Sequence, residues 1–281
     1  MKFGCHVSIK DGYTEAAKIA KSYGAPAFQL FPKNPRSLSV KDINLDDASM
    51  CRDFCLKNSL ESVAHTPYPT SLTPRDTEKR LKVISSLVND LEIAEACGTK
   101  GVVVHFGKQL KANDPLPSYH LMIDVLNEVL SRWQGDAKIL LENSAGLPGT
   151  MGTTMEELAM VRKLSDYPDK IGFCLDTCHA FASGLWTGDN WEEVVAKAEE
   201  IQFFEQLEVI HLNNSKYEMG LGKDRHANIF SGGVIMEKQF EKFIQTPQLR
   251  EIPFILETPK DSISHKEEIQ QLQKKWGHLY L

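Results

Sequence analysis

Short apolar runs recur about every 35 residues along the chain, and most of the segments between them have the spacing of an amphipathic helix. Each run is continuous rather than alternating, which is typical of a strand buried on both faces of a parallel sheet. Strands of this kind separated by helices indicate repeated βα units. The eight runs cover Phe3–Val7, Ala27–Phe31, Ser62–Ala64, Gly101–Val104, Lys138–Leu141, Ile171–Leu175, Glu208–Ile210 and Pro253–Leu256.

Signals for helix ends support this alternation. The segment Thr73-Pro74-Arg75-Asp76 predicts a helix that begins there, with proline at its first position, and that ends at Gly98. Apolar side chains from Leu121 to Leu130 predict a second helix. Further helices are expected to begin at Thr153-Thr154, at Asp189-Asn190 and at Ser264.

Eight βα units in 281 residues predict an α/β fold, the (β/α)8 TIM barrel. The alternative is a doubly wound open sheet, which usually carries a Gly-rich phosphate-binding turn after its first strand. The segment Cys5–Ile9 is not such a turn. Because no Gly/Ser-rich or Pro-rich linker interrupts the sequence, we expect residues 1–281 to form a single domain.

Six consecutive runs are each followed directly by a residue that can bind a metal ion. In a barrel, the carboxyl ends of the strands meet at one mouth, where the active sites of this fold lie. Loops add three more such residues, because His179 lies three residues after Asp176, and Asp224 and His226 are two apart and would face the same side of an extended segment. The nine candidate ligands are His65, His105, Glu142, Asp176, His179, His211, Asp224, His226 and Glu257.

This set of residues predicts a metal centre at the mouth. A single histidine or acid at a strand end more often makes a capping or core hydrogen bond. Nine of them buried together without a cation would cost roughly several kcal/mol per unpaired charge. Imidazole and carboxylate ligands suit Zn²⁺ and also Mn²⁺ or Fe²⁺, and nine ligands are too many for one tetrahedral ion. We therefore expect two or three ions.

The net charge bears on the partner. The chain has 32 Lys and Arg against 38 Asp and Glu, a balance of −6 that by itself argues against a nucleic-acid partner. Assigning four acids to metal ions changes the balance of the remaining residues from −6 to −2, and the ions make the mouth an anion-binding site. Clustered metal ions are characteristic of enzymes that hydrolyse phosphodiesters and phosphomonoesters.

Other features indicate the compartment. No apolar run is long enough to cross a bilayer, and the first residues lack the apolar stretch of a signal peptide. The six cysteines include no CxxC pair, which suits a reducing environment. We expect a cytoplasmic protein without a membrane partner.

Several segments resemble the signatures of a known family. The segments Gly172–Ala182 (GFCLDTCHAFA), Asp224-Arg225-His226 and Ile255–Thr258 are similar to those of endonuclease IV, the zinc-dependent apurinic/apyrimidinic endonuclease family of base excision repair. The similarity spans the chain in order. It continues at Cys5–Ser8, Lys33–Arg36, Leu141–Gly146 and His211–Asn213.

The resemblance implies a monomeric TIM barrel with three zinc ions that cleaves damaged double-stranded DNA at the phosphodiester bond 5′ to an abasic site. It also implies two catalytic carboxylates: Glu142 would bridge two ions, and Glu257 would orient the attacking hydroxide. The implied ligand sets are His65, His105 and Glu142 for the first zinc, Glu142, Asp176, His211 and Glu257 for the second, and His179, Asp224 and His226 for the third.

The resemblance also places Arg36 and Tyr68 where the family contacts DNA. Lys108 and Arg225 fall in loops at the barrel mouth, where they are candidates for phosphate contacts; surface charge is the equal alternative for Lys108. The loops differ from the family pattern, for example at Thr66–Leu72 and Phe106–Lys108. A divergent member with an altered range of DNA substrates is therefore a second interpretation.

Two other classes of protein stay open at this point. Divalent-metal sugar isomerases share the barrel superfamily, although five histidine ligands favour the hydrolytic site. A DNA-damage binder with structural zinc would bind abasic DNA without cutting it. For His6 a substrate contact and a core hydrogen bond are equally consistent with the sequence, and Cys178 is expected to be a buried, inert thiol.

Overall fold

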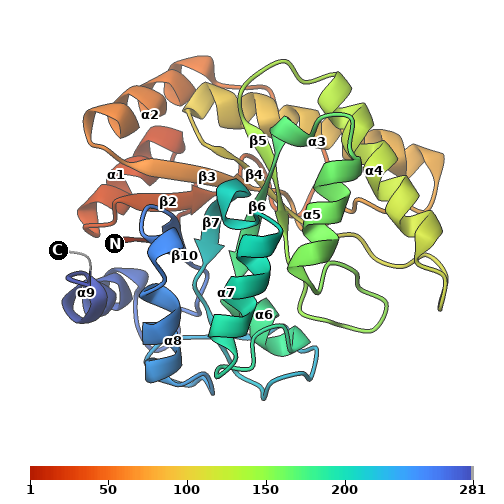
Figure 1. Cartoon of the computed structure of the whole chain (residues 1–281). Helices are drawn as coiled ribbons and strands as arrows, with labels where there is room; N and C mark the ends of the chain where they lie inside the picture. Colours follow the sequence, from red (N-terminus) through yellow and green to blue (C-terminus); the bar gives the residue numbers. More distant parts are fainter. Residues whose placement is uncertain (280–281) are drawn as a thin grey trace.

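The computed structural model describes residues 1–279, and its centre is a closed barrel of eight parallel strands (Figure 1). The order around the barrel is β1-β10-β7-β6-β5-β4-β3-β2, and the pairing of β1 with β10 closes it. Each apolar run forms one strand, so the predicted (β/α)8 fold is confirmed and the open sheet is excluded. The strands are β1 (Lys2–His6), β2 (Ala27–Leu30), β3 (Glu61–His65), β4 (Gly101–His105), β5 (Lys138–Glu142), β6 (Ile171–Asp176), β7 (Leu207–His211) and β10 (Pro253–Leu256).

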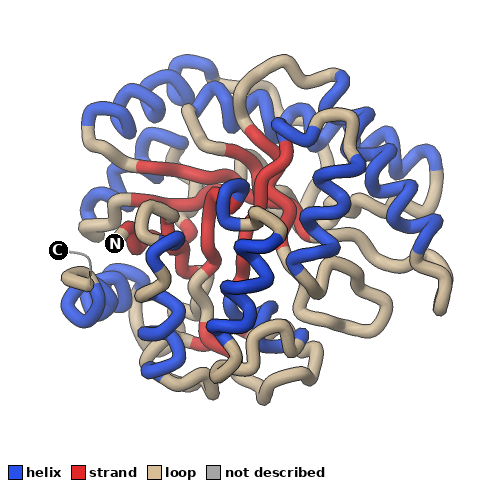
Figure 2. Tube along the Cα trace, viewed as in Figure 1, coloured by secondary structure: helices blue, strands red, loops and turns tan. Residues whose placement is uncertain are grey.

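Helices surround the strands, as the blue segments around the central red ones in Figure 2 show. They are α1 (Tyr13–Ser22), α2 (Leu45–Lys57), α3 (Thr77–Cys97), α4 (Leu116–Ser131), α5 (Met155–Leu164), α6 (Thr177–Ser183), α7 (Trp191–Glu200), α8 (Glu237–Ile244) and α9 (His265–Trp276). Short 3-10 helices precede β6, β7 and β10: η1 (Pro168–Lys170), η2 (Phe204–Gln206) and η3 (Pro247–Leu249). The connection after β7 also contains an antiparallel pair, β8 (Asn214–Ser215) and β9 (His226–Ala227). The described residues include no helix with the length and apolar character that crossing a bilayer requires.

The helix ends agree with the sequence except at one position. Capping boxes open α5 and α9, and Gly98 ends α3 in the left-handed conformation. The predicted start of α3 is wrong: the helix begins at Thr77, and Asp76 caps it by accepting a hydrogen bond from the backbone of Lys79 at 2.7 Å. Thr73 is buried, and its hydroxyl accepts a hydrogen bond from the backbone of Lys108 at 3.0 Å. It therefore joins two loops instead of capping a helix.

The inside of the barrel contains one layer of apolar side chains, separate from the larger core between strands and helices. Seven strands contribute to it. The eighth, β1, has Gly4 at this level, where a Cβ would overlap the carbonyl oxygen of Ala27. We call this layer the barrel floor; it consists of Ala27, Val63, Val103, Leu140, Cys174, Val209 and Ile255.

Candidate metal centre

The side chains above the barrel floor come from the same strands, two residues further along. Because side chains alternate between the two faces of a strand, residue i+2 lies on the same interior face as residue i. Applied to Gly4 and the floor residues, this rule gives His6, Gln29, His65, His105, Glu142, Asp176, His211 and Glu257. Six of these are predicted ligands. The register of the barrel therefore brings them to one level at its mouth.

The first group of predicted ligands is centred on one oxygen of Glu142. Its Oε2 lies 3.2 Å from Nε2 of His105 and 3.7 Å from Nε2 of His65. The three ligand atoms all lie within 4.8 Å of one another. Glu142 is buried, whereas His105 is 48 % exposed at the side chain and faces the opening. This spacing leaves room for a cation between the three atoms.

The second group uses the other oxygen of the same carboxylate. Oε1 of Glu142 lies 2.9 Å from Nδ1 of His211, and that nitrogen lies 3.3 Å from Oε2 of Glu257 and 3.9 Å from Oδ2 of Asp176. Ligand atoms of these four residues also lie within 4.8 Å of one another. The two oxygens of Glu142 thus face two different groups, which is the geometry of a bridging carboxylate.

The third group comes from α6, from β9 and from the loop before β9, whose Asp224 holds the group together. The two oxygens of Asp224 lie 3.4 Å from Nε2 of His179 and 3.3 Å from Nε2 of His226. Asp176 joins this group to the second, because its Oδ2 lies 3.7 Å from Nε2 of His226. His179 reaches the site because Asp176 caps α6 and accepts a hydrogen bond from its backbone N–H at 2.7 Å. All nine predicted residues are therefore brought together.

Backbone carbonyls fix the tautomer of three of the histidines. A carbonyl oxygen only accepts, so Nδ1 of His65 must donate to Thr66 at 2.8 Å, and Nδ1 of His179 must donate to Asn143 at 2.9 Å. Nδ1 of His226 donates in the same way to the carbonyl of Glu257 at 3.3 Å. In the neutral form of each ring the lone pair is then on Nε2, where it can bind a metal ion, which is the usual role of a hydrogen bond behind a ligating histidine.

Gln29 orients His211 and was missed in the sequence. Its Nε2 donates to Oε1 of Glu257 at 2.6 Å, so its Oε1 accepts from Nε2 of His211 at 2.8 Å. The proton that Nδ1 of His211 donates to Glu142 at 2.9 Å is therefore the one that a metal ion would replace, leaving the lone pair for the ion on Nδ1. The amide also donates to Nδ1 of His6 at 3.2 Å. The i+2 register along β2 was the signal that would have found Gln29.

Neighbouring histidines lower the pKa values of the carboxyl groups in the site. Burial opposes ionisation of Glu142, but the charges of His211 and His105 and the hydrogen bond from His211 hold its pKa well below the usual range. Burial is also the largest effect on Glu257, yet the charges of His211 and His65 outweigh it and lower its pKa to about 2. Both carboxylates are therefore anionic, Glu142 buried and Glu257 partly buried, and they require cations beside them.

Two buried atoms without hydrogen-bond partners in residues 1–279 indicate whether metal ions fit the predicted ligands. Oε2 of Glu142 and Nε2 of His226 have no hydrogen-bond partner among the described residues, and both face other predicted ligands. Buried polar atoms without partners are rare unless an ion or water satisfies them. Their chemistry, one carboxylate oxygen and one imidazole nitrogen, is that of zinc ligands. The residues present therefore fit metal ions.

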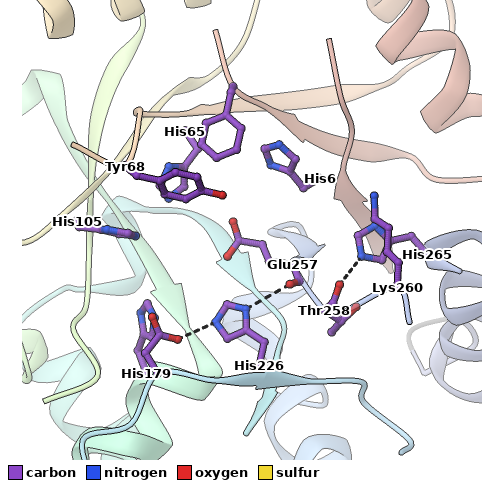
Figure 3. Close-up of a pocket in the computed structure, with 12 residues that line it drawn as sticks. His6, His65, Tyr68, His105, His179, His226, Glu257, Thr258, Lys260 and His265 are labelled. Atoms are coloured by element: carbon purple, nitrogen blue, oxygen red, sulfur yellow. Dashed lines mark hydrogen bonds and ion pairs between the residues drawn. The ribbon is translucent and has the colours of Figure 1, made fainter. Parts of the chain in front are cut away.

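A cavity of about 310 Å³ opens above the site (Figure 3). Most of the predicted ligands line it, and Tyr68, Phe31 and Lys260 complete its rim. His6 also lines the cavity and bonds Gln29, so both roles considered for it are compatible with its position. Cys178 is buried as expected, and burial raises the pKa of its thiol.

The four predicted DNA contacts lie in loops at the same end of the barrel. Tyr68 is 63 % exposed and lines the cavity, and its backbone N–H donates to the carbonyl of Pro35, next to the exposed Arg36, at 2.8 Å. Lys108 and Arg225 are exposed as well, but neither lines the cavity. Arg225 instead borders a neighbouring hollow that it shares with Asp224. Tyr68 is thus the predicted DNA contact that borders the metal-ligand cavity.

The fold and the clustered side chains define a TIM-barrel protein with a candidate metal site at its mouth, and comparison with known proteins agrees with the fold. Residues 17–278 match the family model described as a xylose isomerase-like TIM barrel. A protein of Symbiobacterium thermophilum named probable endonuclease 4 is 40 % identical over 270 residues, covering 96 % of this chain and 97 % of that protein. Endonuclease IV from Thermus thermophilus superposes with a TM-score of 0.86 at 28 % identity, covering 98 % of both chains. The chain belongs to the endonuclease IV family.

The barrel fold alone does not distinguish an endonuclease from a sugar isomerase. A D-tagatose 3-epimerase-like protein superposes with a TM-score of 0.71 over 98 % of this chain and 96 % of its own, but at 21 % identity. Likeness at that level of identity establishes a shared fold and no more. Membership of the endonuclease IV family separates this chain from the sugar isomerases.

Proposed function

We propose that this chain is a DNA-repair endonuclease that hydrolyses the phosphodiester bond 5′ to an abasic site in duplex DNA. The observation that carries the proposal is the position of Glu142, whose two oxygens face two separate groups of imidazole and carboxylate ligands. A cluster of this kind suits phosphodiester cleavage, in which charge develops on both the attacking and the leaving oxygen.

The proposed metals are three zinc ions, for which Mn²⁺ or Fe²⁺ are chemically reasonable substitutes. His65, His105 and Glu142 would hold the first. Glu142 would also hold the second, together with Asp176, His211 and Glu257, and the third would be held by His179, Asp224 and His226. When bound, such ions supply a nucleophile at neutral pH and neutralise the charge on the phosphate and the leaving 3′ oxygen.

The residues of the chain itself have three tasks. Glu257, held by Gln29 at one oxygen, orients the attacking water with the other. Glu142 keeps two parts of the site at a fixed separation, since it is buried and each of its oxygens is directed at a different group. Asp176 fixes the start of α6 and thereby the position of His179. These roles, and the catalytic assignment of Glu142 and Glu257, belong to the proposal.

The loops around the mouth would bind the DNA. Tyr68 and Arg36 lie in neighbouring loops joined by the hydrogen bond to Pro35, which supports a joint role beside a flipped nucleotide. Lys108 and Arg225 would contact phosphates further out. The loop Thr66–Leu72 departs from the family pattern, and a panel of lesion-bearing duplexes would show whether the substrate range has changed with it.

Metal analysis and a nicking assay test this proposal together. The purified protein is analysed for bound metals and then given a duplex with one abasic site or the matched intact duplex. We expect about three zinc ions per chain and one nick 5′ to the lesion, leaving a 3′ hydroxyl, which chelation abolishes and added zinc restores. A metal-loaded protein that binds the abasic duplex without cutting it would instead support the damage-binding alternative. A monomer in solution and a cytoplasmic location are further expectations that size measurement and fractionation would check.

A further inference from the structure

One side of the cavity carries a cation that the proposed metal chemistry does not use. Among the described residues that line the cavity, Lys260 is the only lysine or arginine. It lies in the loop between β10 and α9, three residues after Glu257. In Figure 3, Lys260 and His265 lie on the side of the cavity away from His105 and His179. The amine is exposed, and it has no carboxylate partner within 4.0 Å in the described part of the chain.

The backbone that leads to Lys260 is held by a buried carboxylate. Glu268 of α9 is 1 % exposed, and its Oε2 accepts hydrogen bonds from the hydroxyl of Thr258 at 2.6 Å and from Nδ2 of Asn228 at 3.0 Å. The same Nδ2 donates to the carbonyl of Pro259 at 2.9 Å. The two residues directly before Lys260 are therefore fixed in place, and this part of the loop does not depend on substrate for its shape.

His6 supplies a neutral hydrogen-bond donor to the same cavity. Because the amide nitrogen of Gln29 only donates, Nδ1 of His6 is the acceptor and Nε2 carries the proton. Burial above all lowers the pKa of His6 to about 3, and the nearby charges of His65 and Lys260 act in the same direction. At neutral pH the ring is uncharged, so its Nε2–H is a donor in a residue that lines the cavity.

An unpaired ammonium beside a site for several divalent cations is electrostatically unfavourable unless an anion lies between them. The carboxylates that line the cavity, Asp224 and Glu257, belong to the predicted metal groups, and no carboxylate of residues 1–279 lies within 4.0 Å of the Lys260 amine. A backbone phosphate carries the required charge, and its non-bridging oxygens accept hydrogen bonds. The anion that fits is therefore a phosphate of the substrate strand.

From this geometry we propose that Lys260, with His6 beside it, forms a phosphate-binding subsite facing the metal ligands and determines the affinity for the substrate strand. The subsite rests on the proposed function, since it takes a phosphate of the strand that is cut. Lys260 contributes binding and does not transfer a proton, so its loss should raise KM and leave kcat almost unchanged.

Substitution at Lys260 tests the subsite in the zinc-loaded enzyme. Lys260→Gln should raise KM for the abasic duplex about tenfold, change kcat less than about twofold, and reduce the salt slope of log(kcat/KM) by about one. Lys260→Arg should retain the wild-type salt slope because it keeps the charge. Lys266→Gln is the matched control, since Lys266 is an exposed lysine on α9 outside the cavity lining. Equal KM and salt slope for the Lys260→Gln and Lys266→Gln variants would overturn the subsite.

Calorimetry with inorganic phosphate gives a second readout that does not need DNA cleavage. Phosphate should bind the zinc-loaded wild type several-fold more tightly than the Lys260→Gln variant, and equal binding would contradict the subsite. If the wild type never nicks abasic DNA but binds phosphate in a Lys260-dependent way, the proposed function is contradicted and the phosphate-binding subsite is supported. If nicking persists while neither phosphate binding nor KM depends on Lys260, the proposed function is supported and the subsite is contradicted.

Discussion

Glu142 is the residue on which most of the proposed chemistry depends. It ends β5, it is buried, and its carboxylate contacts ligands of both the first and the second group. Glutamine has nearly the same shape, but it cannot bridge two cations as an anion does. A change at this position therefore separates a role in packing from a role in metal binding.

We predict that Glu142→Gln lowers kcat for abasic-site nicking by at least about 10²–10³-fold, the scale of losing one electrostatic group at a reacting centre. The bound zinc should fall below the wild-type content, while the melting temperature changes little. Glu157→Gln is the control, because Glu157 is another hydrogen-bonded carboxylate, partly buried at the start of α5. Full activity in a folded Glu142→Gln protein would contradict the bridging assignment.

Gln29 is not a predicted ligand, but it contacts two residues that are. Its amide holds both His211 and Glu257 in orientation, and it has no charge of its own. Replacing it with methionine keeps the volume and removes the hydrogen bonds to both ligands, together with the one to His6. We predict that Gln29→Met weakens zinc binding about 10–100-fold, as measured by competition with a chromophoric chelator. Gln273→Met, which removes an amide bonded to Gly24, should leave zinc affinity as in the wild type.

At the scale of the elements, the strands were predicted well because their signal is local. Continuous apolar runs identify strands buried on both faces, and each run proved to be a strand of the barrel. The start of α3 was predicted at Pro74 rather than at Thr77, because Thr73 and Pro74 have the composition of a helix start. The contact that decides it, between Thr73 and Lys108, joins residues 35 apart.

The corrected start of α3 is testable. Asp76→Ala should lower the free energy of unfolding by about 1 kcal/mol, since it removes the side chain that accepts from Lys79. Asp76→Asn should stay close to the wild type because an asparagine can make the same cap. Arg75→Ala, a change at the exposed residue just before the cap, should have little effect. Chemical denaturation measures all three, and a neutral Asp76→Ala would contradict the assigned cap.

At the scale of the whole molecule, side chains from separate strands, helices and loops meet in one charged site. Without metal ions, the charge balance is kept by protonated histidines. Burial, the largest effect on His226, lowers its pKa, but the hydrogen bond to Asp224 and the charges of Asp176 and Glu257 outweigh burial and raise the pKa to about 9. A metal ion must therefore displace a proton from this ring below that pH.

We predict that zinc affinity rises with pH from about 6.5 to about 9 and that zinc binding releases protons. In the metal-free protein, the stability contributed by His226 is fully present below pH 6.5 and is lost as the pH passes 9, because the folded pKa is the higher one. Chelator competition at several pH values, corrected for the chelator itself, measures the affinity. An affinity independent of pH over this range would show that the ion displaces no proton from His226.

The sequence alone determined the barrel and the nine candidate ligands, because strand periodicity and the residue at each strand end are local properties. It did not determine Gln29, Glu268 or Lys260 as parts of the site. Their positions depend on the register between strands and on a loop fixed by a helix, as when Glu268 of α9 bonds Thr258 and Asn228. Only the closed tertiary structure sets these relations, because they join residues that are distant along the chain and whose types are common elsewhere in it.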